Sequence, residues 1–436
     1  MKKNLVLVYL LWVILYFGLL LIFNLISGSA TVGILALAFG LVFFMFPGWL
    51  LNRFLKIEFK EIVGQSLVNF VLSLGFYLLI NLTAIVIGLS IFQLLITNII
   101  LLIILFGAAF IYDYSTQKEY HLDFKFEKIS VIYLLPIMVS ILIIVFIDSQ
   151  GANFNGDPYY HLAIVRKAFD GLSLTVSNLS YSHSAPNNPA YILPAWHLVI
   201  ATYAKLTKID IFAAWSKVNL TLLVWALMII VCFLVSLFFL FYAGPGYFFQ
   251  RLAVPDTLAQ FILLPSVLAF SLIYIFTKNK KILWLLGALM IALADVHAIH
   301  YLYYIFILLF FAISLSLANL FKGKDTLKPA WMLLGVNILV LILVGVILEL
   351  KSGFTSSNLT SFLSAPISEI AYPTFKFFQI TFKIGLALLP LTLIFAKNRQ
   401  SLIIAASFLL APIIYWTPLK DLFLPIGFWV MSVGII

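Results

Sequence analysis

The chain alternates long apolar runs with short polar clusters. A bilayer core is about 30 Å thick, so a helix that crosses it needs roughly 20 consecutive apolar residues. Such runs lie at 5–26, 31–51, 67–87, 91–112, 130–147, 190–204, 218–242, 257–277, 282–296, 298–321, 330–350, 373–396, 400–417 and 421–436. An open sheet would leave backbone groups unpaired in lipid. The pattern therefore predicts an all-α, polytopic transmembrane protein with about 13–14 membrane helices.

A different kind of element is predicted in the long polar segment 148–189. Asp157 comes directly before Pro158, which is typical of an N-cap followed by proline at the first helical position. Gly171 suits the C-cap of the same helix, so an amphipathic surface helix of about 13 residues is expected. The resulting plan is N-terminal transmembrane helices over 1–147, an extracytoplasmic acidic loop over 148–189 and a transmembrane core over 190–436. The core ends inside an apolar run at Ile436, as expected of either a truncated or a divergent C-terminus.

Composition excludes a soluble protein. The chain is 64% hydrophobic and 10% charged, whereas soluble domains are about 45–50% apolar and about 25% charged. Its one cysteine, Cys232, lies inside an apolar run, which excludes a disulfide framework and a thiolate metal site. The net charge of +10 is spread over many short loops, so no nucleic-acid partner is predicted.

The distribution of basic residues predicts the orientation in the membrane. With a cytoplasmic N-terminus, alternation of the spans places 19 of the 26 Lys and Arg residues inside, as the positive-inside rule requires. The run 190–204 is short, but omitting it would move the lysines of 278–281 and 322–328 outside. The loops 148–189, 243–256, 295–300, 351–372 and 418–421 then face outward, and they carry most of the polar chemistry.

The first candidate group lies at residues 156–161, which read GDPYYH. Asp157 is either a helix cap or a carboxylate held above the membrane as general base or metal ligand. Tyr160 and His161 follow it on the same predicted helix and are candidate substrate-binding residues.

The second group combines acidic and basic residues. Asp256 stands at the start of a predicted span, where the helix dipole favours a carboxylate, and Arg251 is the one basic residue of its outward loop. A guanidinium suits a phosphate or carboxylate, although an Arg251–Asp256 pair is the structural alternative. Lys376 and Lys383 lie seven residues apart on one face of a predicted span, where an anionic lipid headgroup would suit both.

The third group is the hinge 295–300. His297 and His300 are spaced to face one side of a helix and to bind a metal with Asp295 or Asp157. The alternative is that a hinge between two spans simply needs polar residues. A divalent metal such as Mg²⁺ or Mn²⁺ is the cofactor considered.

These segments together resemble the GT-C superfamily of integral-membrane glycosyltransferases. That superfamily includes protein mannosyltransferases, lipid A aminoarabinose transferases and the catalytic subunits of oligosaccharyltransferases. The resemblance rests on 157–161 (DPYYH), 191–197 (YILPAWH), 251–259 (RLAVPDTLA) and 285–297 (LLGALMIALADVH), with a looser match at 418–425. The resemblance depends on the order of these segments along the chain and on their common position on the outward side of the membrane.

The resemblance implies an enzyme that moves a sugar from a polyprenyl-phosphate donor to an acceptor hydroxyl on the extracytoplasmic face. Asp157 would be the catalytic base or a metal ligand, and Asp256 would order its loop or act as a second acidic site residue. Arg251, Lys376 and Lys383 would contact the donor phosphate. The partners would be the polyprenyl-phosphate-linked sugar, membrane lipids, and an acceptor glycan, lipid or protein.

Two other functions remain open on the sequence. A transporter or flippase of lipid-linked glycans would distribute polar residues near the membrane midplane and would show paired repeats. A noncatalytic membrane subunit would keep the fold and use its acidic residues only as helix caps.

Overall fold

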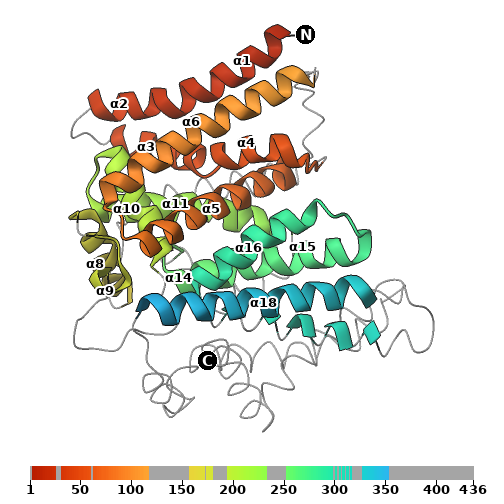
Figure 1. The fold of residues 1–436 in the computed structure, drawn as a ribbon. Coiled ribbons are helices and arrows are strands. Elements are labelled where there is room, and N and C mark those ends of the chain that lie inside the picture. The colour runs from red at the N-terminus through yellow and green to blue at the C-terminus, as the bar shows by residue number, and fades with distance from the viewer. Residues whose placement is uncertain are drawn as a thin grey trace. The chain divides into compact units, whose positions relative to one another are not determined.

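The computed structural model describes residues 2–25, 31–59, 62–116, 157–171, 173–179, 194–232, 252–297 and 327–352, with short stretches between 300 and 316. Every named regular element in these ranges is a helix (Figure 1). The chain divides into two units. Unit 1 comprises Met1–Asn187, Leu193–Ser266 and Lys281–Val296, and unit 2 comprises Asn188–Ile192, Val267–Lys280 and His297–Ile436.

The N-terminal helices of unit 1 follow the predicted spans 5–26 and 31–51. The first is continuous through a π-helical turn, and the second is interrupted at residues 44–45. The elements are α1 (Lys2–Val13), the π-helical turn η1 (Ile14–Gly18), α2 (Leu19–Leu25), α3 (Thr31–Phe43) and α4 (Phe46–Leu55). Pro47 lies in the first turn of α4, where its missing N–H costs no helical hydrogen bond. The proline thus explains why the second apolar run forms two helices.

Two long helices form the next part of unit 1. They are α5 (Ile62–Ile87) and α6 (Ile91–Ser115), and they extend the predicted spans 67–87 and 91–112 by up to five residues. Gly88 adopts a φ of +78° between them. Ser90 and Gln93 then start α6 with a reciprocal capping box. The short turn between the helices is therefore specified locally by glycine and serine.

The segment after the acidic loop contains four helices of unit 1. They are α8 (Asp157–Phe169), α9 (Val176–Leu179), α10 (Ala195–Thr207) and α11 (Ile211–Cys232). The predicted helix of about 13 residues is confirmed as α8, and its place at the membrane surface stays a prediction. Leu162, Val165 and Ala168 are buried, whereas Tyr159 and Arg166 are exposed.

The predicted connector between the runs 190–204 and 218–242 is too long. Only residues 208–210 lie between α10 and α11, and the two helices bend by 112° at this break. Asp210 accepts a hydrogen bond from the Phe212 amide and starts α11 seven residues before the predicted boundary. Lys217, predicted in a connector, lies inside α11, because a lysine stem can cover apolar surface while its ammonium reaches water.

The C-terminal part of the described chain contributes helices to both units. The elements are α14 (Pro255–Leu258), the π-helical turn η3 (Ala259–Leu263), α15 (Leu264–Thr277), α16 (Ile282–Val296) and α18 (Leu327–Ser352). The helix α16 has the predicted bounds. Its 15 residues are fewer than the roughly 20 of a full crossing.

Glycines permit close helix packing in unit 1. A Cβ atom at Gly75 of α5 would lie 2.6 Å from the Cβ atom of Ala288 in α16. A Cβ atom at Gly48 of α4 would overlap the carbonyl of Asn69 in α5. Small residues at such positions let helix backbones approach closely, as is typical of helices that pack in membranes.

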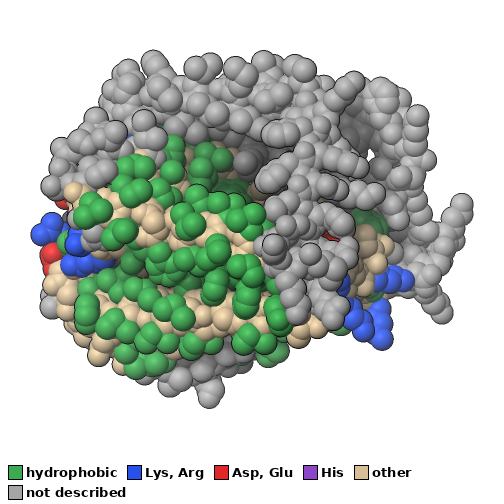
Figure 2. Space-filling view, turned by 90° about the horizontal axis from the view of Figure 1, so that it is seen from above, with side chains coloured by type: hydrophobic (Ala, Val, Ile, Leu, Met, Phe, Trp, Pro, Cys, Tyr) green, Lys and Arg blue, Asp and Glu red, His purple; other side chains and the backbone are tan. Residues whose placement is uncertain are grey.

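One face of unit 1 is apolar and exposed. Figure 2 views the side on which α1, α2 and α6 lie, and hydrophobic side chains spread over it while charged side chains lie at its margins. Exposed residues of α1, η1 and α6 include Leu7, Leu10, Leu11, Ile14, Phe92, Ile96, Ile100, Ile103, Ile104 and Ile111. Five helices in the described ranges are long and apolar enough to cross a membrane, or six if α10 and α11 form one broken span. The fold thus defines an all-helical, multi-pass membrane protein.

Contacts between loops show which loops lie at the same end of unit 1, and they agree with the predicted alternation of inward and outward loops. At one end, Lys281 Nζ donates to the Lys56 carbonyl at 2.9 Å. At the other end of α5, the Leu174 amide donates to the Leu89 carbonyl at 2.7 Å. The basic loops before α5 and α16 therefore share one end, and the loop after α8 lies at the opposite end.

Candidate functional site

The helix α8 begins at Asp157, the predicted catalytic carboxylate. Proline at position 158 favours a helix start at this point, and Gly171, with a φ of +92°, lies just beyond the helix end at Phe169. The backbone of Asp157 is described and its side chain is not. The sequence pattern therefore fixes where this residue lies in the fold, namely in the first turn of a helix that packs mainly on α10.

A buried pair of imidazoles joins α8 to α10. His161 Nδ1 and His197 Nε2 are 2.9 Å apart, so one ring donates an N–H to the other. Both residues are buried. Eight residues further along each helix, Lys205 Nζ lies 3.8 Å from the centroid of the Phe169 ring. These two contacts show that α8 and α10 run in parallel, with the Asp157 end of α8 near the start of α10.

The second acidic segment is attached to the same turn of α10. Trp196 Nε1 donates to the Ala253 carbonyl at 2.9 Å, and the Ala253 amide donates to Asn219 Oδ1 of α11 at 3.0 Å. Both polar groups of the Ala253 backbone are thus held by buried side chains. Three residues later, Asp256 lies half-buried in the first turn of α14.

The start of α10 therefore connects both predicted acidic segments. Trp196 and His197 are neighbours in the chain, and each holds one segment through a buried hydrogen bond. Asn81 of α5 fixes the preceding residue, since its amide donates to the Ala195 carbonyl at 2.9 Å. The structure brings the two segments to one helix end, at the end of unit 1 that also holds the loop after α8.

Asp295 lies at the end of α16 and is also directed at this turn. Its carboxyl group is buried, with 3% of the residue exposed, and α16 contacts α10. Seven residues before it, Ala288 meets Gly75 of α5, and six residues after Gly75, Asn81 binds the Ala195 carbonyl, so Asp295 lies level with the start of α10. Neither carboxylate oxygen reaches normal hydrogen-bond geometry with any described residue. Asp295, predicted as a possible metal ligand, is thus placed opposite a helix N-terminus.

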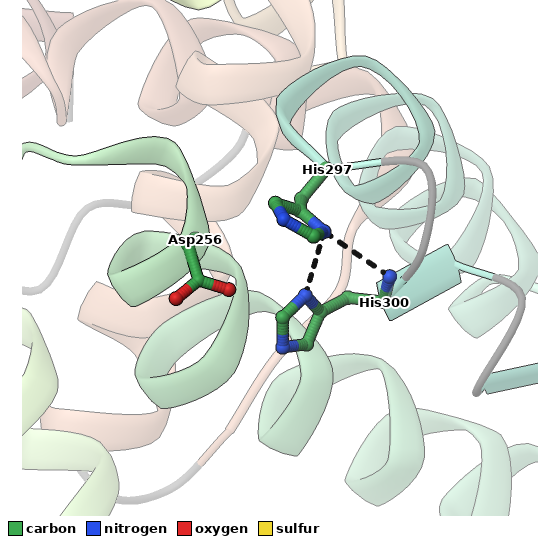
Figure 3. A group of neighbouring side chains, drawn as sticks. All are labelled: Asp256, His297 and His300. Carbon is green, nitrogen blue, oxygen red and sulfur yellow. Dashed lines mark hydrogen bonds between the residues drawn. The ribbon is translucent and has the colours of Figure 1, made fainter. Parts of the chain in front are cut away.

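The histidine pair of the hinge belongs to unit 2. His297 Nδ1 lies 2.8 Å from His300 Nδ1 and also accepts the His300 backbone N–H at 3.4 Å (Figure 3). Burial, together with the nearby charge of His300, holds the pKa of His297 well below its usual value, so this imidazole is neutral at pH 7. Tyr301, in the same segment, donates to Asn337 Oδ1 of α18 at 2.9 Å.

The geometry of these two imidazoles is compatible with a shared metal ion. Two histidine nitrogens that each lie about 2.0–2.1 Å from one ion, at a right angle, are about 3 Å apart, close to the observed 2.8 Å. Imidazole nitrogens suit Zn²⁺, Fe²⁺ or Ni²⁺ better than Mg²⁺, which prefers oxygen ligands. If a metal binds here, the pair therefore favours a transition metal over the Mg²⁺ considered from the sequence.

Of the remaining predicted site residues, the structure describes Tyr160 alone. Tyr160 is half-buried, and its ring meets the His161 ring edge-on at 5.2 Å between centroids. Arg251, Lys376 and Lys383 lie outside the described residues. The grouping of Asp157, Arg251 and the two lysines around one donor phosphate therefore stays a prediction.

Sequence reasoning missed the residues that assemble the site. Trp196 and His197 lie in a segment of the resemblance but are not predicted site residues, and neither are Asn81 and Asn219. All four carry polar groups inside apolar helices, where such groups are costly and usually functional or structurally paired. That signal was present in the sequence, but it does not reveal which polar residue pairs with which.

Compared with protein-family models, with curated proteins and with solved structures, the chain gives no match. The class of protein therefore follows from its helices.

Proposed function

We propose that this protein is a membrane glycosyltransferase of the GT-C type, which transfers a sugar from a polyprenyl-phosphate donor to an acceptor hydroxyl on the extracytoplasmic face. One observation carries the proposal. The two acidic segments that resemble this superfamily, 157–161 and 251–259, are held by adjacent residues of α10 through buried hydrogen bonds. Segments that served only as separate helix caps would not need a common anchor.

The proposed chemistry is a displacement at the anomeric carbon. The acceptor oxygen forms a bond to this carbon while the bond from the carbon to the donor phosphate oxygen breaks. Asp157 takes the proton of the acceptor hydroxyl as general base, or acts as a metal ligand near the leaving phosphate. The products are the glycosylated acceptor and the polyprenyl phosphate, which stays in the membrane.

The other site residues receive roles that match their chemistry. Arg251, Lys376 and Lys383 bind the donor phosphate, because cationic side chains stabilise charge on a leaving phosphate. Asp256 orders its loop or acts as a second acidic residue at the site. Tyr160 remains a substrate contact. The burial of His161 favours a role in holding α8 over direct contact with the sugar.

The proposal is tested by a transfer assay on the whole protein in sealed membrane vesicles. Radiolabelled polyprenyl-phosphate sugars are supplied as a panel, with vesicles of both orientations. We expect label to enter an acceptor fraction only where the extracytoplasmic face meets the donor, with release of polyprenyl phosphate. Movement of intact labelled donor across the vesicle membrane would instead identify a transporter. A complete absence of transfer with every donor would overturn the proposal and favour a noncatalytic subunit.

A further inference from the structure

The first turn of α10 lacks a capping side chain of its own. Its N-cap residue is Pro194, which makes no side-chain hydrogen bond to the helix, and proline offers no side-chain acceptor. The first N–H groups of a helix have no partner within the helix and carry the positive end of its dipole. A polar oxygen acceptor from another element can therefore stabilise this end.

Asp295 supplies a carboxylate at this position from a different helix. It is the next-to-last residue of α16, it is 3% exposed, and it lies level with the start of α10 on a helix that contacts α10. Burial of a carboxylate without strong hydrogen bonds is costly. An apolar side chain at the end of an apolar helix would avoid that cost. The carboxyl group thus does not help the stability of α16, and its stabilising effect on the start of α10 is the better explanation for its presence.

The consequence of this contact extends beyond α10. Trp196 and His197, which follow directly, are the residues that hold the Ala253 segment and α8. A shift of the first turn of α10 would therefore displace both acidic segments at once.

We propose that Asp295 is a positioning residue, whose buried carboxylate stabilises the start of α10 and thereby fixes the two segments that carry Asp157 and Asp256. The importance of this for sugar transfer rests on the proposed function. The placement of α8 by Asp295 does not rest on the proposed function, and it can be measured without a substrate.

The experiment measures how easily α8 leaves α10. In the full chain with Cys232→Ala, the substitution Ala168→Cys puts a single thiol at a buried position of α8. A second protein carries Ala109→Cys instead, a buried position of α6. The rate of maleimide labelling is followed in purified protein at low temperature, with and without substitution of Asp295.

Asp295→Ala should label the α8 thiol about tenfold faster, a change equivalent to about 1.4 kcal/mol, and should leave the α6 thiol unchanged. Asp295→Asn retains an oxygen that can face the amides, so it should label at a rate between those of the wild type and Asp295→Ala. If Asp295→Ala yields no folded protein, Asp295→Asn carries the test and must label α8 faster than wild type.

Asp113→Asn is the matched control. Asp113 is also a buried carboxylate of unit 1, but it is paired with Arg53 at 2.7 Å. Its loss should lower thermal stability and leave the α8 thiol protected. Unchanged labelling in the Asp295 variants, or an equal rise for the α6 thiol, would overturn the proposal. Faster α8 labelling in a protein without transfer activity would support the positioning role and count against the proposed function alone.

Discussion

His161 and His197 form a buried hydrogen bond between imidazole nitrogens 2.9 Å apart. This contact lies one helical turn after Asp157 and in the first turn of α10. It therefore sets where the predicted catalytic helix begins relative to the rest of unit 1. The same turn of α10 holds the segment that leads to Asp256 through Trp196.

Replacing His197 by alanine should loosen α8. A buried polar group that loses its partner costs about 1–3 kcal/mol, so His197→Ala should destabilise the protein by an amount of this order. His161→Ala should do the same. The double variant should cost less than the sum of the two, because both remove one shared interaction. Additive effects in thermal unfolding would contradict the pairing.

The indole of Trp196 offers a test of the second attachment. Trp196→Phe keeps an aromatic ring and removes the N–H that donates to the Ala253 carbonyl, so it should cost about 1–3 kcal/mol through the unpaired carbonyl. Trp225→Phe is the control, because the buried Trp225 Nε1 has no hydrogen-bond partner among the described residues. The two variants create a similar loss of volume. Equal destabilisation of both would show that the indole hydrogen bond does not contribute.

The exposed face of α6 should contact lipid. Ile103 lies in the middle of α6 and is 56% exposed. An arginine near the centre of a spanning helix costs about 2.5–3.5 kcal/mol on insertion scales, so Ile103→Arg should reduce the yield of membrane-integrated protein. Tyr114→Arg near the helix end should be tolerated, because the side chain can snorkel to the interface. Equal yields in a membrane-extraction assay would argue that α6 is covered by protein.

The histidine pair of unit 2 should retain a divalent transition metal if it is a ligand pair. Elemental analysis of purified wild-type protein should then show bound metal, which the variant with His297→Ala and His300→Ala loses. A variant with His161→Ala and His197→Ala is the matched control, because it removes another buried imidazole pair. Metal-free wild type, or equal loss from both variants, would leave the hinge histidines with their mutual hydrogen bond as their role.

Much of the fold could be predicted because hydrophobic runs and helix caps are local signals. The bounds of α16 and the position of α8 followed from apolar length, from Pro158 and from Gly171. The start of α11 could not be placed in this way. Lys217 is charged, and sequence reasoning put it in a loop, whereas the Asp210 cap begins the helix before it.

The assembly of the site could be predicted only in part. The alternation of spans predicted that the acidic loops lie on the same side of the membrane, and the structure attaches two of them to the start of α10. The pairings of His161 with His197 and of Trp196 with Ala253 join residues 36 and 57 positions apart. Tertiary packing selects such partners, and no local pattern encodes them. Asp295 illustrates the same point, since it was considered as a metal ligand and lies opposite the start of α10.

The most direct test of the proposed function compares Asp157→Asn with Asp170→Asn in the sugar-transfer assay. Asparagine still caps a helix, so Asp157→Asn separates loss of the base from loss of the fold. Asp170 lies just beyond the other end of α8 and pairs with Arg166 on the exposed surface at 2.9 Å. We predict that Asp157→Asn loses transfer at normal expression, by at least the roughly 100-fold typical of a general base, while Asp170→Asn stays active. Transfer at the wild-type rate by Asp157→Asn would contradict a catalytic role for this carboxylate.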